Sequence, residues 1–551
     1  MCIEIESNKN TESRKLHSKI KEIAGKRKNT CSSSGCLKAK DGTIIIEKEE
    51  IIKRWEEYIE ELFDDERGIK PTRKDEDYGE DILKSEVEFA LRKMKRGKAP
   101  GPDQVNVEML DSAGEIGLEK LTELINKVYN TGNIPGDLLK SIFIAIPKKP
   151  KANECELHRT ISLMSHITKI LLRILMKRAR TQIKPEISDS QCGFVQGKGT
   201  RNAIYMMRTL IERSIEMKQD IYVCMIDYSK AFDKVQHEPF MEILKDLNIE
   251  GKSWRLIRNI YWDQSATIRY ENELGTWKSI RRGLRQGCVF SPDGFSIYSE
   301  RIMKKIEDMP EAKVGGVNIS NVRFADDTAL IANTEKDLQE LVNKIKEESK
   351  LYGLSLNKKK TYTMVFSKKK EIPKCSIKID GVELEQVKQF NYLGSILTSD
   401  GRSKVEIDRR IGQAKSAFGN MTNILSNKKI SIQTRLRTLK AYIWPIMKYA
   451  CETWNIGKEE GRKIESFEFW CYRRMQKISW TERKSNDEVL RSVGVEKELL
   501  NGIKEQQMKF FGHIVREGNI QELIAKGRIE GSGARGRQII RQLDNIRGSY
   551  N

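Results

Sequence analysis

Two short segments carry aspartates where a rigid backbone can hold them. In 221–233 an apolar, β-type run ends at Asp227, and in 321–331 Asp326 and Asp327 lie between two apolar stretches. Three aspartates brought together repel one another strongly unless a cation joins them. The spacing therefore indicates a cation site at the ends of strands.

Carboxylate oxygens are hard ligands that select Mg²⁺ or Mn²⁺. Two such ions about 3.5–4 Å apart stabilise an in-line displacement at phosphorus, as in polymerases. We therefore predict nucleotidyl transfer with two Mg²⁺ or Mn²⁺ ions held by Asp227, Asp326 and Asp327. A lone Asp-Asp pair is more often a turn after a strand. Here the flanking apolar residues predict a hairpin with the carboxylates at its tip.

Composition limits the classes of protein to consider. The chain has 551 residues, enough for two to four domains, and 100 Lys and Arg against 79 Asp and Glu give a net charge of +21. Such an excess favours polyanionic partners, although a solubilising surface is the alternative. The ten cysteines lack metal-ligand spacing and the five histidines do not cluster, so histidine-based nuclease chemistry is not indicated. No apolar run reaches 18 residues, and with no signal peptide we expect an intracellular protein with reduced thiols.

Periodicity indicates the elements that position these residues. Helical spacing of apolar residues predicts helices over 51–63, 82–96 and 116–130. The glycines and prolines of 97–103 interrupt helices and strands and predict a breaker-rich turn there. An apolar run predicts a strand over 141–146. Between 160 and 366, strands and helices alternate, with a helix that starts at Thr334 and a strand over 362–366.

After a second predicted hairpin, the pattern of the chain changes from alternating strands and helices to helices alone. Asp380-Gly381 predicts a turn between two short strands. From about residue 402 the pattern is almost wholly helical, and we expect its tryptophans to fill a core; stacking on nucleic-acid bases is the alternative. The last 26 residues are rich in Arg and Gly and predict a flexible basic tail.

Seven motifs, in order from Lys98 to Leu397, closely resemble those of the reverse transcriptase of non-LTR (LINE-type) retrotransposons. They are Lys98-Ala-Pro-Gly-Pro-Asp103; Ile144–Lys149 with His158–Leu163; Gln191–Phe194 with Gly197–Arg201; Asp227–Asp233; Arg282–Pro292; Phe324–Asp327 with Asn357–Thr361; and Phe390–Gly394. The resemblance implies a right-hand polymerase of α/β class, with fingers, an α+β palm whose antiparallel catalytic sheet packs on helices, and a helical thumb.

The resemblance also implies roles at the centre of the site. Asp227, Asp326 and Asp327 match the catalytic, metal-binding aspartates, and the carbonyl of Tyr228 is a further metal ligand in similar polymerases. Lys360 matches the lysine that protonates the leaving pyrophosphate. The residues implied to bind the nucleotide are Lys148 and Arg159 at the triphosphate, Phe232 as the gate against a 2′-OH, and Gln286 and Gly287 near the base pair. Core packing is the alternative role for Phe232.

Template and primer contacts follow from the same resemblance. The residues implied are Gln191, Gly193, Phe194 and Arg285, and Tyr392, Leu393 and Gly394 of a primer-grip hairpin. The chain departs from the family at Cys192, where an aromatic is usual, and at Phe324-Ala325, where a tyrosine version is commoner. It departs again at Asp293-Gly294, where large apolar residues are usual.

We expect four regions: a charged helical extension and linker (1–80), fingers and palm (81–400), a thumb (401–480), and a basic helical region with a flexible tail (481–551). No segment matches the N-terminal endonuclease, zinc knuckle or RNase H domain of related elements. The expected partners are an RNA template, a DNA primer and dNTPs, and no membrane partner is expected. We expect the protein to occur in the nucleus and cytoplasm as part of a ribonucleoprotein. The alternatives are a group II intron maturase, a host-domesticated reverse transcriptase, or a catalytically dead nucleic-acid-binding relic.

Overall fold

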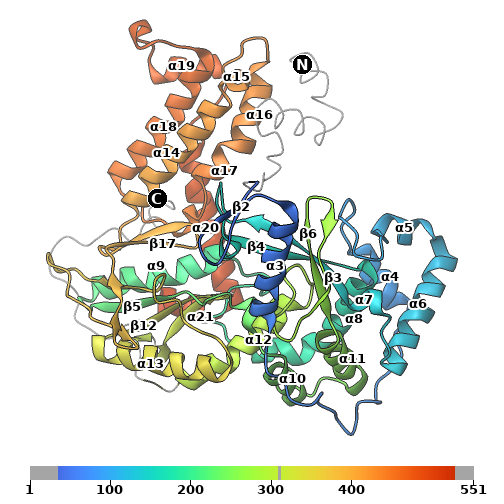
Figure 1. The fold of residues 1–551 in the computed structure, drawn as a ribbon. Helices are drawn as coiled ribbons and strands as arrows, with labels where there is room; N and C mark the ends of the chain where they lie inside the picture. The colour runs from blue at the N-terminus through green and yellow to red at the C-terminus, as the bar shows by residue number, and fades with distance from the viewer. Residues whose placement is uncertain (1–34, 308, 310–311, 315, 528–551) are drawn as a thin grey trace.

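The computed structural model describes residues 35–527, except 308, 310–311 and 315. It consists of two five-stranded sheets with their covering helices and a helical bundle that stands above them (Figure 1). This arrangement is the right hand that the sequence predicts: fingers, palm and thumb.

The fingers are built on the sheet β4-β3-β6-β7, to which β8 is added at the edge of β6. Its strands are β3 (Lys140–Pro147), β4 (His158–Met164), β6 (Ser265–Tyr270), β7 (Glu273–Leu274) and β8 (Lys278–Ser279). Helix α3 (Lys48–Phe63) covers one face and buries Trp55, Tyr58 and Phe63 against Phe143 and Ile268. The predicted helix over 51–63 and strand over 141–146 are confirmed.

Helices complete the fingers and the base of the palm. They are α4 (Lys84–Arg92), α5 (Val107–Ser112), α6 (Gly114–Thr131), α7 (Gly136–Leu139), α8 (His166–Ile183), α10 (His237–Asp246) and α11 (Gly251–Trp262). The breaker-rich turn over 97–103 packs on the start of α8, where Ser165 donates a 2.5 Å hydrogen bond to Asp103. Gly101 allows this approach, because a Cβ there would lie 2.4 Å from the Ser165 nitrogen.

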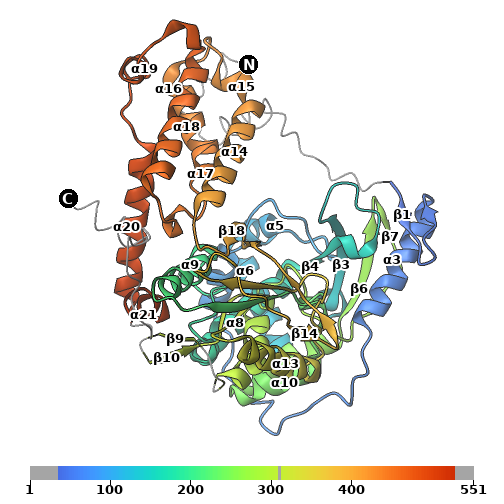
Figure 2. The ribbon, with the colours of Figure 1, turned by 90° about the vertical axis from the view of Figure 1, so that its left-hand side faces the viewer.

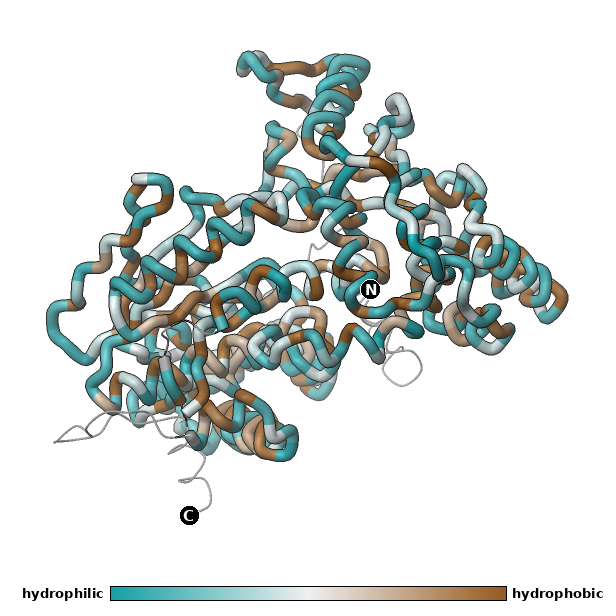
Figure 3. Tube along the Cα trace, turned by 90° about the horizontal axis from the view of Figure 1, so that it is seen from below, coloured by the Kyte–Doolittle hydropathy of each residue, from teal (hydrophilic) through white to brown (hydrophobic). Residues whose placement is uncertain are grey.

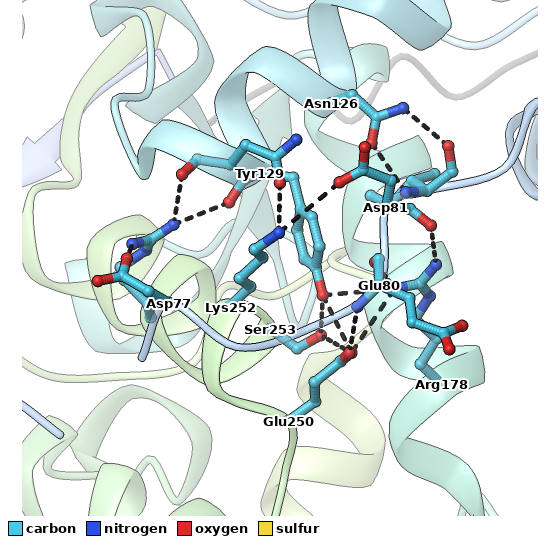
Figure 4. A network of polar contacts seen from close by, with 12 residues as sticks. Asp77, Glu80, Asp81, Asn126, Tyr129, Arg178, Glu250, Lys252 and Ser253 are labelled. Carbon is cyan, nitrogen blue, oxygen red and sulfur yellow. Dashed lines mark hydrogen bonds and ion pairs between the residues drawn. The ribbon is translucent and has the colours of Figure 1, made fainter. Parts of the chain in front are cut away.

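Residues 64–83, which we call the strap, join α3 to α4 across α11. Arg258 of α11 donates hydrogen bonds to the Pro71 carbonyl and to Glu76, and Arg255 pairs with Asp77. Further along, Glu80 and Asp81 are joined by backbone and side-chain contacts to α8 and to the start of α11, and the backbone of Ile82 bonds Asn126 of α6 (Figure 4). Residues 35–83 therefore pack against the fingers sheet and its helices, and the predicted domain boundary at residue 80 stays a prediction.

The palm sheet has the order β11-β12-β5-β13-β16, and all its pairs are antiparallel except β13–β16. Its strands are β5 (Ile221–Ile226), β11 (Asn321–Phe324), β12 (Asp327–Ala332), β13 (Tyr362–Phe366) and β16 (Glu385–Gln386). Helix α9 (Thr200–Glu216) covers one face, and α12 (Ser291–Met303) and α13 (Glu335–Leu351) cover the other. The sheet is therefore buried on both faces, which explains the continuous apolar run of β5.

Shorter strands lie at the edges of the palm. They are β9 (Ala312–Val314) with β10 (Val317–Ile319), β14 (Lys378–Ile379) with β15 (Val382–Glu383), and β17 (Gln389–Tyr392) with β18 (Ser395–Thr398). The hairpin predicted across Asp380-Gly381 is confirmed. A two-stranded pair, β1 (Leu37–Lys38) with β2 (Ile44–Ile45), precedes α3.

The thumb contains α14 (Lys404–Asn420), α15 (Thr422–Leu425), α16 (Ile432–Tyr442), α17 (Trp444–Met447), α18 (Lys458–Gln476) and α19 (Asn486–Val493). Trp444 and Trp454 are buried in its core and Trp470 is packed at the edge, as the sequence predicts. Figure 3 shows hydrophobic and hydrophilic residues alternating along the helices, as expected for amphipathic elements. No helix in the described part of the chain has the length and apolar character of a membrane span.

After the thumb the chain returns to the palm through α20 (Leu499–Glu517) and α21 (Ile520–Lys526) (Figure 2). Asn202 of α9 donates a 3.0 Å hydrogen bond to Gln521, and Arg213 donates to the carbonyls of Ile524 and Ala525. Helices α20 and α21, which belong to the predicted basic C-terminal region, therefore connect the thumb to the palm. The predicted flexible tail lies, from residue 528, outside the described residues.

The contact between strap and α11 can be tested by one methyl group. A Cβ at Gly251 would lie 1.7 Å from the carbonyl oxygen of Asp75, so Gly251→Ala must displace the strap. We expect a loss of about 1–3 kcal/mol in unfolding free energy, measured with urea, and faster proteolysis within 64–83. Gly412→Ala is the control, because nothing lies near its Cβ and alanine favours the helical conformation at this exposed position of α14. Equal stability of the two variants would contradict the strap contact.

Candidate active site

The aspartate pair lies at the tip of the β11–β12 hairpin, as predicted. Phe324 pairs with Asp327, so Ala325 and Asp326 form a two-residue turn, with Ala325 in the left-handed region (φ 59°). In the neighbouring strand pair, Thr328 is opposite Ile226. Because Asp227 follows Ile226 and Asp327 precedes Thr328, the register brings both aspartates to the same end of the sheet.

Asp227 is fixed by the loop that precedes β13. The side chain of Asn357 donates a 3.1 Å hydrogen bond to Oδ2 of Asp227, and its backbone N–H donates to the Asp227 carbonyl at 2.8 Å. The Asp227 N–H points to Oγ1 of Thr361 at 3.4 Å. The Tyr228 side chain turns away into the core and bonds Ser349. Asp227 is therefore oriented by residues of another motif.

The three carboxylates lie within electrostatic reach of one another. Burial and the charges of Asp326 and Asp227 raise the pKa of Asp327 to about 6. Burial, with the charge of Asp227, also raises the pKa of Asp326. None of the three forms an ion pair with any described residue. Among the described residues, no group of three or more His, Cys, Asp or Glu side chains is arranged so that it could hold a metal ion. A divalent cation would relieve this repulsion, and the hard oxygen donors fit Mg²⁺ or Mn²⁺.

A group of cationic side chains, which we call the basic cluster, faces the carboxylates. Lys148 follows β3, Arg159 lies on β4, Lys230 follows β5 and Lys360 precedes β13. Burial lowers the pKa of Lys148, and the charges of Lys360, Arg159 and Lys230 lower it further, so these three lie within electrostatic reach of Lys148, whose amine donates a 2.9 Å hydrogen bond to the Glu156 carbonyl. The charge of Arg159 also acts on Asp326, against the increase in its pKa that burial causes. Of the neighbouring lysines, Lys358 pairs instead with Asp380. The basic cluster suits a ligand with several negative charges.

The predicted sugar gate is held by other aromatic rings. Phe232 is half-buried and stacks on Phe295 of α12 with ring centroids 4.4 Å apart. Phe194 meets it edge-on at 6.1 Å, and with φ 60° that residue keeps 47% of its surface exposed. The ring of Phe232 is therefore both a packed residue and part of the site wall.

The turn that contains Gln286 is tied to the end of β5. Nε2 of Gln286 donates a 3.0 Å hydrogen bond to Oδ1 of Asp233, a carboxylate that is 8% exposed. Burial raises the pKa of Asp233 to about 6, against the opposite effect of the Gln286 hydrogen bond and the charges of Lys230 and Lys148. Gly287 (φ 103°) is exposed at the tip of the turn.

Gln191 supports the catalytic hairpin from below. Its Oε1 accepts hydrogen bonds from the backbone N–H groups of Ala325 (2.9 Å) and Gly193 (2.7 Å). A Cβ at Gly193 would lie 2.2 Å from the Ala325 nitrogen, so only glycine fits beside this turn. The left-handed conformation of Ala325 is therefore stabilised by a second segment of chain.

The β17–β18 hairpin, expected as primer grip, is joined to the thumb. Its tip is formed by Leu393 and Gly394, both half-buried and with positive φ. Tyr449 donates a 2.7 Å hydrogen bond to the Leu393 carbonyl, and Arg409 and Arg410 donate to the Gly394 carbonyl. The position of this tip is therefore set by thumb helices.

Comparison with protein families gives a decisive match. Residues 146–397 match the model of the family described as reverse transcriptase (RNA-dependent DNA polymerase). Residues 146–397 form a reverse transcriptase domain. The match includes the carboxylates, all four residues of the basic cluster and the tip of the β17–β18 hairpin.

Curated relatives place this domain among those of non-LTR retrotransposons. The chain is 25% identical over 341 residues to the retrovirus-related Pol polyprotein of a type-2 retrotransposable element of Drosophila melanogaster, covering 60% of this chain and 31% of that protein. It is 24% identical over 391 residues to the RNA-directed DNA polymerase from mobile element jockey of Drosophila funebris, covering 68% and 42%. The chain thus spans less than half the length of these relatives.

Among solved structures, apo telomerase from Candida tropicalis is 12% identical, with a TM-score of 0.37. The match covers 75% of this chain and 73% of the telomerase chain. A score this low carries no inference about this chain.

Three residues expected to touch template or primer have buried side chains within the reverse transcriptase domain. Gln191 bonds the hairpin turn, Arg285 bonds Gln264 and the Leu139 carbonyl, and Tyr392 is 3% exposed. These buried contacts give the three residues a structural role in the domain, and the expected contacts of all seven residues with template or primer stay predictions. Phe194, Leu393 and Gly394 keep exposed surface.

Sequence reasoning missed Asn357, Lys230 and Asp233 as members of the site. All three lie within quoted motifs, so motif membership was the available signal. Only some positions of each motif were given a role, and the contacts between motifs are set by the fold. The Asp293-Gly294 departure is explained in part: a Cβ at Gly294 would lie 3.1 Å from the Phe240 ring, so a small residue fits there.

Loss of the Gln191 amide should loosen the catalytic hairpin. In Gln191→Leu the N–H groups of Ala325 and Gly193 lose their acceptor in a buried place, so we expect a loss of about 1–3 kcal/mol in unfolding free energy by urea denaturation. Gln413→Leu, on the exposed face of α14, is the control and should change stability far less. Comparable losses in both variants would argue against the support role.

The raised pKa of Asp327 predicts a pH-dependent gain of stability in Asp327→Asn. Ionisation of Asp327 is disfavoured in the folded state, so above pH 6 its charge lowers the unfolding free energy of the wild type. The variant has no carboxyl there and escapes this loss. Without divalent cations we expect Asp327→Asn to unfold at higher temperature at pH 8. The difference should shrink as pH falls through about 6 and vanish below about 4. A difference independent of pH would refute the assigned repulsion.

Proposed function

We propose that this chain is an RNA-directed DNA polymerase of a non-LTR retrotransposon, which extends a primer 3′-OH with dNTPs on an RNA template. One observation carries the proposal. Within a reverse transcriptase domain, three aspartates without ion-pair partners among the described residues face a basic cluster of four side chains. Nucleotidyl transfer requires acidic side chains that bind the divalent cations and, opposite them, basic side chains that bind the phosphates.

Two Mg²⁺ or Mn²⁺ ions would be held by Asp227, Asp326 and Asp327, with the carbonyl of Tyr228 as a further ligand. Bound there, the ions would supply activation of the primer hydroxyl and neutralisation of the triphosphate. The unpaired carboxylates with raised pKa values support this fit. Asn357 would keep Asp227 in its binding orientation.

The remaining side chains act on the nucleotide. Arg159 has no ion-pair partner among the described residues, and its guanidinium can grip a phosphate bidentately, with Lys148 and Lys230 beside it. Lys360 would donate a proton to the leaving pyrophosphate. The Phe232 ring would fill the space of a 2′-OH and so favour dNTPs over rNTPs.

The template and primer would be bound mainly through phosphates. The net charge of +21 favours such contacts, which are largely independent of sequence. The helical thumb would lie along the RNA–DNA duplex and recognise its A-like shape more than its bases.

A catalytically dead nucleic-acid-binding relic is the second candidate, favoured only by Asp293-Gly294 at the start of α12. Primer extension separates the two. We expect the purified chain to extend oligo(dT) on poly(rA) with dTTP and Mg²⁺. Binding of the duplex without extension would support the relic.

Asp326→Asn provides the matched test of the site. Its isosteric amide cannot hold a cation as a carboxylate does, so we expect primer extension to fall to background. Duplex affinity, measured by fluorescence anisotropy, should stay within about twofold because it depends on basic residues elsewhere. Extension comparable to the wild type would overturn the site assignment.

A further inference from the structure

Five exposed lysines, which we call the distal lysine surface, gather at the end of the palm sheet opposite the carboxylates. One precedes β5, three lie in the loop 367–374 that follows β13, and one separates β16 from β17. The members are Lys218, Lys368, Lys370, Lys374 and Lys388. Asp220 precedes β5 and Asp227 follows it, so strand steps of about 3.3 Å place this surface roughly 23 Å from the catalytic end of the sheet.

Hydrogen bonds hold the segments of this surface side by side. The Ser367 N–H donates at 3.2 Å to the Ser399 carbonyl, and the Ser399 N–H donates at 3.1 Å to the Lys388 carbonyl. At the other end of the loop, Nε2 of Gln386 donates at 2.8 Å to the Pro373 carbonyl. The loop is therefore fixed at both ends, and its lysines cannot move far from one another.

The charges of the five lysines are not neutralised by neighbouring carboxylates. Lys369, the remaining lysine of the loop, pairs at 2.6 Å with Asp220, which lies two residues after Lys218. None of the five forms an ion pair with a residue that the structure describes. Glu371 and Glu385 are exposed on the same segments and are equally unpaired. Five unpaired cations against two unpaired carboxylates leave an excess of positive charge that repels itself unless a polyanion binds.

The chemistry of the surface favours a nucleic acid over a membrane. The exposed residues of the loop 367–374 are lysines and one glutamate, with no exposed apolar side chain to enter a lipid layer. A lysine amine is a compact charge on a flexible stem, which contacts phosphates without reading bases. The surface therefore fits a phosphate backbone bound without sequence preference.

We propose that the distal lysine surface binds the phosphate backbone of RNA that lies outside the active site. The choice of RNA rests on the proposed function, in which an RNA template is copied and only a short part of that strand occupies the active site at one time. The surface then retains RNA through contacts that are separate from catalysis.

Lysine acetylation, read by mass spectrometry, tests the surface in the unaltered protein. We expect a short RNA hairpin to slow acetylation of all five lysines severalfold. Exposed lysines without ion pairs beside the fingers helices should react at an unchanged rate, because the palm strands β5, β12 and β17 lie on the opposite side of the molecule from α5 and α6 (Figure 1). These control lysines are Lys74, Lys95, Lys127 and Lys184.

A combined variant measures the contribution of the surface to binding. It carries Lys218→Gln, Lys368→Gln, Lys370→Gln and Lys388→Gln. Each lost phosphate contact accounts for roughly 0.7–0.9 in the slope of log affinity against log salt concentration, so the slope for the hairpin should fall by about 3. The matched control variant replaces the four control lysines by glutamine and should keep the wild-type slope. Thermal melting and primer extension of the combined variant should equal those of the wild type.

Equal loss of RNA affinity in the two variants would show an effect of net charge alone and would overturn the inference. Protection of the five lysines by phosphatidylserine vesicles but not by the hairpin would overturn it as well. Neither binding measurement needs catalysis. Absence of primer extension by the wild type would refute the proposed function, so the two failures are distinguishable.

Discussion

Mutual repulsion between Asp227, Asp326 and Asp327 is the constraint around which the palm is arranged. Charges that repel must be held by something stronger than side-chain packing, and here they are held by backbone. Asp326 occupies a two-residue turn whose other member, Ala325, has a left-handed conformation that costs free energy for a residue with a Cβ. Gln191 and the missing side chain at Gly193 stabilise that turn.

The supports of the hairpin extend into the interior. Arg323 on β11 and Glu300 on α12 form a 3.0 Å ion pair in which both side chains are almost fully buried. Such a pair contributes little net stability, but loss of one partner leaves an isolated buried charge. Its effect is to fix β11 to α12, the helix whose Phe295 stacks on Phe232. The carboxylates and the Phe232 ring are thus positioned by one connected set of contacts.

The opposing charges come from elsewhere in the chain. Lys148 and Arg159 lie on the fingers sheet, which α3 covers, and the strap ties α3 to the helices behind it. Lys230 lies over the Tyr58 ring of α3 at 4.3 Å, so a helix near the start of the described chain contacts the site. On the opposite side, α20 and α21 join the thumb to α9 and so to the palm sheet. Fingers, palm and thumb are therefore coupled through side chains distant in sequence.

The sequence alone determined the local features. Apolar periodicity predicted α3, β3 and β13, because burial of one or both faces leaves a repeat in the chain. The Asp380-Gly381 turn predicted the β14–β15 hairpin. Motif order predicted the right hand and the catalytic aspartates, since each motif is a short segment whose chemistry is carried by its own residues. The sequence could not show that Gln191, Arg285 and Tyr392 turn inward, because their exposure depends on contacts with residues up to 146 positions away in the chain. The contacts of Asn357 with Asp227 and of Asp233 with Gln286 join segments that only the folded sheets bring together, so tertiary structure alone decided them.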